Sequence, residues 1–171
     1  MRGAVIALTA VIVGVSVRTA DASFGTRDQI PAPTDVENVI QVWLECDECT
    51  GGELQAVVTL GPKAVPILAS MLQKGPAKER LDAQRKHLLK RYGSLRDYQK
   101  THSDARVTES EDEFVGRYMN KYETLQRIRA ARALGAIGGA DARNALDQAL
   151  KLPLSPEVLK AVKESRAKIA G

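Results

Sequence analysis

The chain has 171 residues and a formal net charge of +4 at pH 7. This small positive excess argues against nucleic-acid binding, which usually needs a strongly basic surface. Aromatic residues make up only 4% of the sequence, whereas alanine and leucine are frequent. The combination favours packed helices over a β-sandwich. We therefore predict an all-α fold, with residues 36–171 forming a single helical domain.

The first 22 residues have the pattern of a secretory signal peptide. Arg2 precedes the uncharged run from Ala4 to Val15, and a small-residue cleavage site ends at Ala22. The run is shorter than the roughly 20 apolar residues that a membrane-spanning helix requires. We predict cleavage after Ala22, export to the periplasm or the cell exterior, and no stable membrane span afterwards. The alternative is a retained N-terminal anchor, because Thr9 and Gly14 are tolerated in membrane helices.

Residues 23–35 contain two prolines, a glycine and few apolar side chains, which predicts a disordered N-terminal arm. A helix is expected from Val36 to about Cys46, capped by Thr34 or Asp35. Trp43 lies on the apolar stripe of this helix. We expect its side chain in the core rather than in a ligand site.

Two apolar helical runs follow in GELQAVVTLGPKAVPILASMLQKGP, separated by the helix breakers Gly61 and Pro62. The pattern predicts a helix, a sharp turn and a second helix. Pro62 suits the first position of the second helix, where its missing N–H costs nothing, and Pro66 falls in or near the same turn. Gly75 and Pro76 are expected to close this hairpin.

A similar sequence returns in LQRIRAARALGAIGGADARNALDQAL, residues 125–150. It again matches a helix, a glycine turn and a second helix, and so indicates an internal repeat. A last helix is expected after Ser155, which can act as its cap, with Pro156 at the first helical position. This helix would cover the end of the helical array.

The segments LGPKAVPIL and ARALGAIGGADARNAL both resemble bacterial HEAT repeats, whose helical hairpins stack into an α-solenoid. The resemblance implies a short α-solenoid that offers binding surfaces to partners and has no shared catalytic residues. Two features depart from the family pattern. The turn GPKAVP is shorter than GGADARNA, and residues 76–124 separate the two recognisable units.

The separating segment is rich in charge and has helical spacing in both halves. From Lys74 to Arg106 the sequence has ten Lys or Arg residues against four Asp or Glu. We expect an inserted hairpin of two long antiparallel helices, with a bend at Thr101–Ser110 and a second helix that runs into the later repeat. The apolar stripes expected to hold it together are Leu81, Leu88, Tyr92 and Leu95 on one helix, and Phe114, Tyr118, Leu125 and Ile128 on the other.

The first inserted helix carries the candidate interaction surface for an anionic partner, formed by Lys86, Lys90, Arg91 and Arg96. A basic run of this kind is more often a solvated helix face, and nearby acidic residues can neutralise it. The insertion also holds every tyrosine of the chain. We expect packing rather than recognition for these side chains, which are Tyr92, Tyr98, Tyr118 and Tyr122.

Cys46 and Cys49 form the only CxxC motif. We expect a structural disulfide, because export favours oxidised cysteines. A thiol oxidoreductase would place the motif at a helix start within a βαβ unit, which is missing here, and the flanking acidic residues disfavour a reactive thiolate. A metal site is expected least, because two thiolates fill half of a zinc shell and His87 and His102 lack ligand spacing.

The familiar catalytic and phosphate-binding motifs do not occur, so the sequence predicts no catalytic residues, no cofactor and no bound metal. The leading hypothesis is a non-enzymatic HEAT-like module that binds an unidentified protein partner in the periplasm or outside the cell. One alternative is an exported thiol-disulfide protein that uses Cys46 and Cys49. Another is a protein that binds an anionic envelope polymer through the basic hairpin face.

Overall fold

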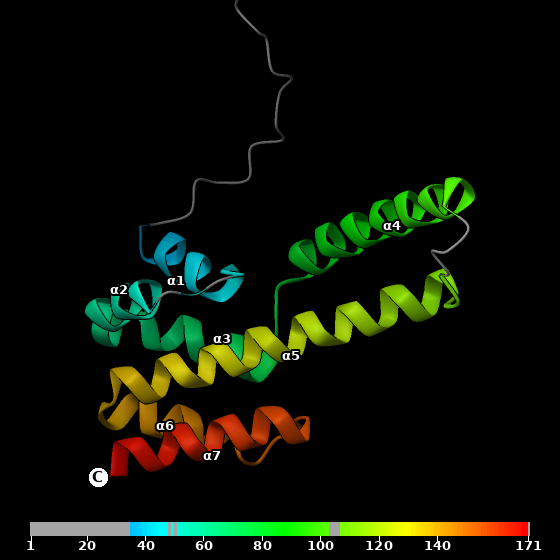
Figure 1. Ribbon diagram of the computed structural model, residues 1–171. Helices are drawn as coiled ribbons and strands as arrows, with labels where there is room; N and C mark the ends of the chain where they lie inside the picture. Colours follow the sequence, from blue (N-terminus) through cyan, green and yellow to red (C-terminus); the bar gives the residue numbers. More distant parts are fainter. Residues whose placement is uncertain (1–34, 48, 50, 103–106, 171) are drawn as a thin grey trace, which may run out of the picture. The chain divides into compact units, whose positions relative to one another are not determined.

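The computed structural model describes residues 35–47, 49, 51–102 and 107–170, and every regular element in these ranges is a helix (Figure 1). The predicted all-α class is confirmed. The chain divides into the units Met1–Ala32 and Pro33–Gly171, and all of the residues above belong to the second. The predicted signal peptide, its cleavage site and the arm before Asp35 lie outside the described residues.

Three short helices begin this unit: α1 (Asp35–Glu45), α2 (Gly52–Leu60) and α3 (Val65–Lys74), with the 3-10 turn η1 (Gly61–Ala64) between α2 and α3. The break falls at Gly61 as predicted, where a φ of +57° favours glycine. Pro62 lies within η1. The third α-helix therefore begins at Val65, three residues after the start that the sequence predicted, with Pro66 in its first turn.

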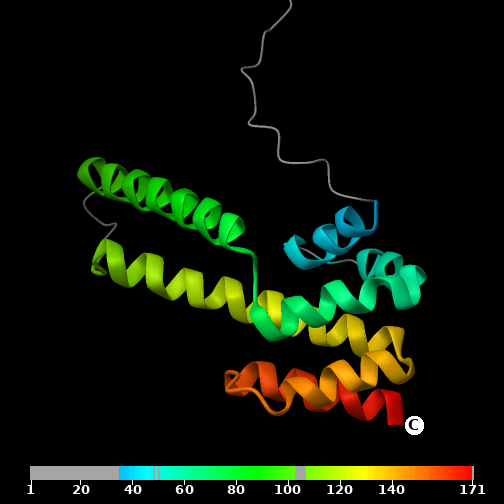
Figure 2. The same ribbon diagram turned by 180° about the vertical axis from the view of Figure 1, so that it is seen from behind.

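Two long antiparallel helices follow, α4 (Lys78–Thr101) and α5 (Glu111–Ile137), and they lie side by side in Figures 1 and 2. Ser110 and Glu113 form a capping box at the start of α5. The Ser110 hydroxyl accepts from the Glu113 N–H at 3.3 Å, and the Glu113 carboxylate accepts from the Ser110 N–H at 2.8 Å. Below, "the hairpin" means α4 with residues 111–124 of α5.

The chain ends in α6 (Gly139–Ala149) and α7 (Pro156–Ala170). Gly138 and Gly139 turn the chain from α5 into α6 with φ values of +71° and +81°. Ser155 caps α7 as predicted, since its hydroxyl accepts from the Val158 N–H at 3.4 Å. Below, "the body" means α1, α2, α3, residues 125–137 of α5, α6 and α7.

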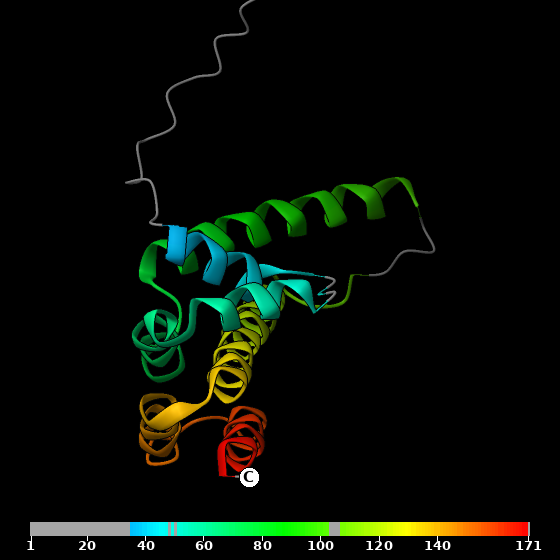
Figure 3. The same cartoon turned by 90° about the vertical axis from the view of Figure 1, so that its left-hand side faces the viewer.

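The second half of α5 lies at the centre of the body and packs against α1, α2, α3, α6 and α7 (Figure 3). Its buried apolar residues are three alanines and one leucine, namely Ala130, Ala131, Ala133 and Leu134. Gly135 lets α7 come especially close, because a Cβ at this position would lie 2.7 Å from the Cβ of Ser165. Small side chains on α5 thus allow five helices to share one core.

The segment Gly52–Lys74 is the one described stretch that is long and apolar enough, by length and composition, to cross a membrane. In the structure it forms α2, η1 and α3 rather than one straight helix. Its side chains Val57, Leu68 and Leu72 are fully buried in the core of the body. Core packing therefore uses part of the apolar surface of this segment.

The hairpin has a small core of its own. Leu88, Phe114 and Val115 are buried, and Tyr92 and Leu95 pack against them, as the apolar stripes predicted. Three residues of the predicted stripes lie outside this core, and the first of them, Leu81, is only partly buried and belongs to neither core. Leu125 is 38% exposed because it borders a pocket instead of packing on α4, and Ile128 packs against the core of the body.

Candidate functional site

A pocket of about 400 Å³ lies where the hairpin meets the end of α1. We call it the hairpin pocket. The face of α4 supplies Gln84, His87, Leu88 and Arg91, and the end of α1 supplies Leu44, Glu45 and Asp47. The face of α5 supplies Tyr118, Tyr122, Leu125, Gln126 and Arg129. The lining residues of α4 follow an i, i+3, i+4, i+7 pattern and those of α5 an i, i+4, i+7, i+8, i+11 pattern, so the helical repeat brings them onto one face.

Arg129 joins α5 to the end of α1 at the base of the pocket. Its guanidinium donates to the backbone oxygen of Leu44 at 2.5 Å and also to that of Cys46. The Trp43 indole donates in turn to the Arg129 backbone oxygen at 3.1 Å. The last carbonyls of a helix lack partners within the helix and favour a cation, so Arg129 stabilises the end of α1.

The electrostatics of Arg129 fit this anchoring role. Burial lowers the pKa of its guanidinium below the ordinary value for arginine, while the nearby Asp47 carboxylate opposes that change. The side chain remains a cation near neutral pH because an arginine titrates far above it. Trp43 is 6% exposed and packs in the core, as the sequence predicted.

Glu45 is already paired inside the hairpin pocket. Its carboxylate forms an ion pair with Arg80 at 2.9 Å and accepts a hydrogen bond from the Tyr122 hydroxyl at 3.4 Å. Burial raises the pKa of Tyr122, and the Glu45 carboxylate raises it further. The phenol therefore stays protonated and acts as a donor.

Two polar groups of the pocket have no such partners. Gln126 is only 2% exposed, and no hydrogen bond joins its side-chain amide to another described group. Arg91 forms no ion pair with a described carboxylate, and its guanidinium lies 5.8 Å from the centre of the Tyr118 ring. Gln126 and Arg91 therefore both offer hydrogen-bond donors to the pocket that they line.

The basic residues predicted as an interaction surface are all exposed on α4, but they do not form one patch. A helix turns by about 100° per residue, which places Lys86 and Lys90 together on the side opposite the buried Leu88. Arg91 turns toward the hairpin pocket. Arg96 lies on the other flank of α4, where it donates to the Gln99 amide oxygen at 3.0 Å.

The tyrosines of the hairpin behave differently from one another. Tyr92 packs as expected, with its ring 5.4 Å from Phe114 and its hydroxyl donating to the Glu109 backbone oxygen at 2.9 Å. Tyr118 also packs on Phe114, with ring centres 4.6 Å apart. Tyr98 departs from the packing expectation, because it is 53% exposed and stacks only on His102.

Cys46 and Cys49 lie at disulfide-bonding distance, with Cα atoms 5.5 Å apart, so the predicted pairing is confirmed. The pair directly follows the C-terminus of α1. Reactive cysteines are instead favoured at helix N-termini, where the helix dipole stabilises a thiolate. Among the described residues, no group of three or more His, Cys, Asp or Glu side chains could hold a metal ion.

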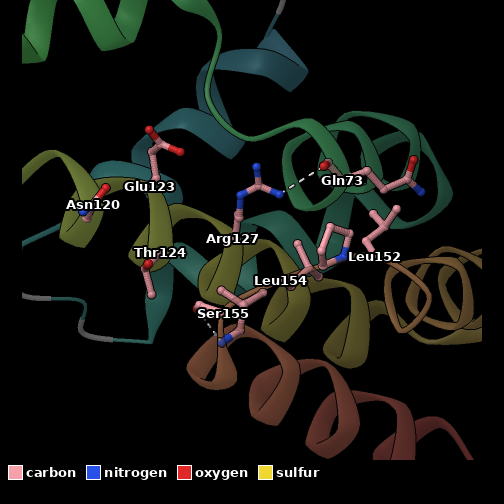
Figure 4. A pocket seen from close by; sticks show the side chains of 10 residues that line it. Gln73, Asn120, Glu123, Thr124, Arg127, Leu152, Leu154 and Ser155 are labelled. Atoms are coloured by element: carbon pink, nitrogen blue, oxygen red, sulfur yellow. Dashed lines mark hydrogen bonds between the residues drawn. The ribbon is translucent and has the colours of Figure 1, made fainter.

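A second pocket, of about 510 Å³, lies between the end of α3, α5 and the start of α7 (Figure 4). Arg127 projects into it and donates to the backbone oxygens of Leu72 at 2.8 Å and Gln73 at 3.0 Å. Gly75 leaves room for this contact, since a Cβ there would lie 2.9 Å from the Arg127 guanidinium. Arg127 therefore binds the end of α3 in the way that Arg129 binds the end of α1.

Sequence reasoning missed Arg127, Arg129 and Gln126. The helical spacing of Tyr118, Tyr122 and Gln126 was the only available sign, because it places an amide on the same face as two phenols. The partners of both arginines lie more than fifty positions earlier in the chain. A local pattern does not predict such distant pairs.

No protein-family model, curated protein or solved structure matches this chain. The hairpin pocket combines polar groups that lack partners with aromatic and aliphatic walls. Those are the general features of a recognition site.

Proposed function

We propose that the chain is an exported, non-enzymatic module of HEAT-like hairpins that binds a protein partner in the periplasm or outside the cell. The observation that carries the proposal is the hairpin, which presents exposed cations on the outer side of α4 and a pocket on the side that faces α5 and α1. Lys86 and Lys90 form no ion pair with a described carboxylate. Unpaired surface charge of this kind steers a complementary partner and orients it on approach.

The HEAT-like part of the proposal is supported by a parallel between two turns. α2 ends at Gly61 with φ +57° and ψ −135°, and α5 ends at Gly138 with φ +71° and ψ −164°. Each glycine leads into a second helix, α3 or α6, and these two helices pack against each other. Stacking of one hairpin on the next is the arrangement expected of helical repeats.

Charge reversal tests the role of the hairpin cations. The double variant Lys86→Glu and Lys90→Glu is compared with wild type in affinity purification from envelope extract, quantifying the protein that wild type enriches. The matched control, Lys160→Glu and Lys163→Glu, makes the same charge change on exposed positions of α7. We expect the hairpin variant to lose about tenfold in recovery and the control to match wild type.

Equal recovery by both variants, or no protein enriched by wild type, would contradict the proposal. Circular dichroism on each variant ensures that a loss of recovery does not come from unfolding. All four lysines are exposed, so their replacement should change stability little.

Export is tested separately by the intact mass of the protein purified from its native host. Cleavage after Ala22 would leave a chain that begins at Ser23. A mass corresponding to all 171 residues would contradict the proposed cleavage and favour the retained anchor.

Binding of an anionic envelope polymer is a second candidate, and the exposed Lys86 and Lys90 favour it. Retention on an anionic polymer column that falls steeply between low and physiological salt would support it, because salt screens exposed charges. Protein capture that survives the same rise in salt would favour the protein partner. The two readings thus differ in one chromatographic measurement.

The thiol-disulfide candidate has one favourable observation, which is that Cys49 is exposed. The location of the pair at the C-terminus of α1 and beside acidic residues argues against it. Insulin reduction by the purified protein, together with the midpoint potential of the pair, distinguishes a redox function from a structural disulfide. Turnover with a readily exchanged pair would replace the binding proposal with a redox one.

A further inference from the structure

We infer that the hairpin pocket binds a carboxylate presented by the protein partner, so that an acidic side chain inserts between α4 and α5. The inference rests on the proposed function, because it names the chemistry of the partner segment. It is carried by the pocket geometry, by a buried amide without a partner and by an arginine without an ion pair.

Some charged groups of the pocket interact with other groups of the chain, and one cation has no ion pair with a described carboxylate. Glu45 is held by Arg80 and Tyr122, and the Arg129 guanidinium is directed at the backbone oxygens that end α1. Asp47 acts electrostatically on Arg129. The cation left without a carboxylate is Arg91. A ligand that complements the pocket therefore carries negative charge.

Gln126 adds hydrogen-bond donors to the pocket. Its amide is almost completely buried, it lines the pocket, and it has two N–H donors with no acceptor among the described groups. A carboxylate in the pocket can accept from the Arg91 guanidinium, while the Gln126 amide can donate to another oxygen of the same partner segment. Hydrogen bonds to an ionised acceptor are about twice as strong as neutral ones.

The walls of the pocket suit a side chain rather than a bare ion. Leu88, Tyr118 and Leu125 line it, and Leu125 is 38% exposed, so apolar surface is open to contact. The methylene groups of a glutamate can cover this surface while the carboxylate reaches inward. The volume of about 400 Å³ also leaves space for neighbouring atoms of the partner segment.

The test is a titration of the ¹⁵N-labelled full chain, followed by NMR at the side-chain amide of Gln126. That resonance is assigned by its loss in Gln126→Leu. The probe is N-acetyl-glutamate methylamide, and its neutral isostere N-acetyl-glutamine methylamide is the comparison. We expect a saturable shift with the glutamate probe, at least about tenfold weaker binding of the glutamine probe, and loss of the shift in Arg91→Gln.

Lys90→Gln is the matched control, because it removes a neighbouring cation from the outer side of α4 and should keep the shift. Absence of a shift in wild type, equal shifts with both probes, or an unchanged shift in Arg91→Gln would overturn the inference. Succinate forms a further arm. Tighter binding of succinate than of the glutamate probe would assign the pocket to a free dicarboxylate and overturn the partner-borne carboxylate.

Failure of the inference and failure of the proposed function can be distinguished. If the Gln126 resonance does not respond but lysine reversal still lowers recovery, the partner binds the outer face of α4 and the pocket inference is wrong. If the resonance responds but lysine reversal has no effect on recovery, carboxylate binding stands and the proposed role of the outer lysines is wrong.

Discussion

The body and the hairpin share one helix, α5, and use its two halves differently. In the second half, small side chains such as Ala131 and Ala133 are fully buried among five neighbouring helices. In the first half only Phe114 and Val115 are buried, and the remaining contacts are made near the surface, as in the ion pair of Arg117 with Glu109 at 2.8 Å. Tight packing in the body provides stability, which leaves the hairpin free to expose charge.

Two leucine truncations test this contrast most strongly. Leu134 and Leu88 are both almost fully buried, in the body and in the hairpin respectively. We expect Leu134→Ala to lower the free energy of unfolding by about 4 kcal/mol and Leu88→Ala by about 2 kcal/mol, because the small hairpin core can collapse around the lost atoms. Chemical denaturation measures both, and a larger loss for Leu88→Ala would reverse the assignment of stability to the body.

Arg129→Met tests whether the anchor between α5 and α1 belongs to the body. The variant leaves two backbone oxygens at the end of α1 without their charged donor. We expect a loss of about 3 kcal/mol in the free energy of unfolding. Arg80→Met is the control, since its ion pair with Glu45 is exposed and should be worth less than about 1 kcal/mol. Similar losses for the two variants would refute the anchoring role.

Two glycines of α5 allow the same substitution to be compared in each half. A Cβ at Gly135 would meet Ser165, whereas a Cβ at Gly116 would meet nothing within 4 Å. We expect Gly135→Ala to destabilise the chain by about 2 kcal/mol through overpacking. Gly116→Ala should stabilise it by about 0.5–1 kcal/mol, because alanine favours a helix. Thermal unfolding measures the change in stability of each variant. A change in the same direction for both variants would contradict the difference in packing.

The smallest expected effect is the pH dependence of the capping box at the start of α5. Hydrogen bonds from the Ser110 backbone and then its side chain lower the pKa of Glu113 below 4.5. A lowered pKa means that this stabilisation is present above the unfolded value and is lost as pH falls through the folded value. NMR titration should find the Glu113 midpoint below 4.5, and Ser110→Ala should move it upward. An unchanged midpoint in Ser110→Ala would refute the capping box as its cause.

Local signals predicted much of the fold. Gly61, Pro66 and Pro156 mark helix boundaries because their backbone preferences act within one turn. The long second helix of the hairpin was also predicted to run into the later repeat, and α5 does so without a break. The delayed start of α3 was not predicted, because a 3-10 turn accepts Pro62 as readily as an α-helix does.

The candidate site was predicted only in part. Arg91 and the tyrosines of the hairpin were singled out, but their grouping with Glu45 and Gln126 was not. That grouping depends on how α1 packs against the hairpin, which involves contacts between residues far apart in the sequence. The basic run also predicted one surface, whereas the helical turn points its side chains in three directions.

The most direct test of the division between body and hairpin is site-specific photo-cross-linking in the native host. A photoreactive residue replaces Lys90 on the outer side of α4 in one protein and Lys163 on α7 in another, both exposed positions. We expect a defined cross-linked protein from position 90 and none from position 163. Cross-linking from position 163 alone, or equally from both positions, would contradict the claim that the hairpin is the recognition element.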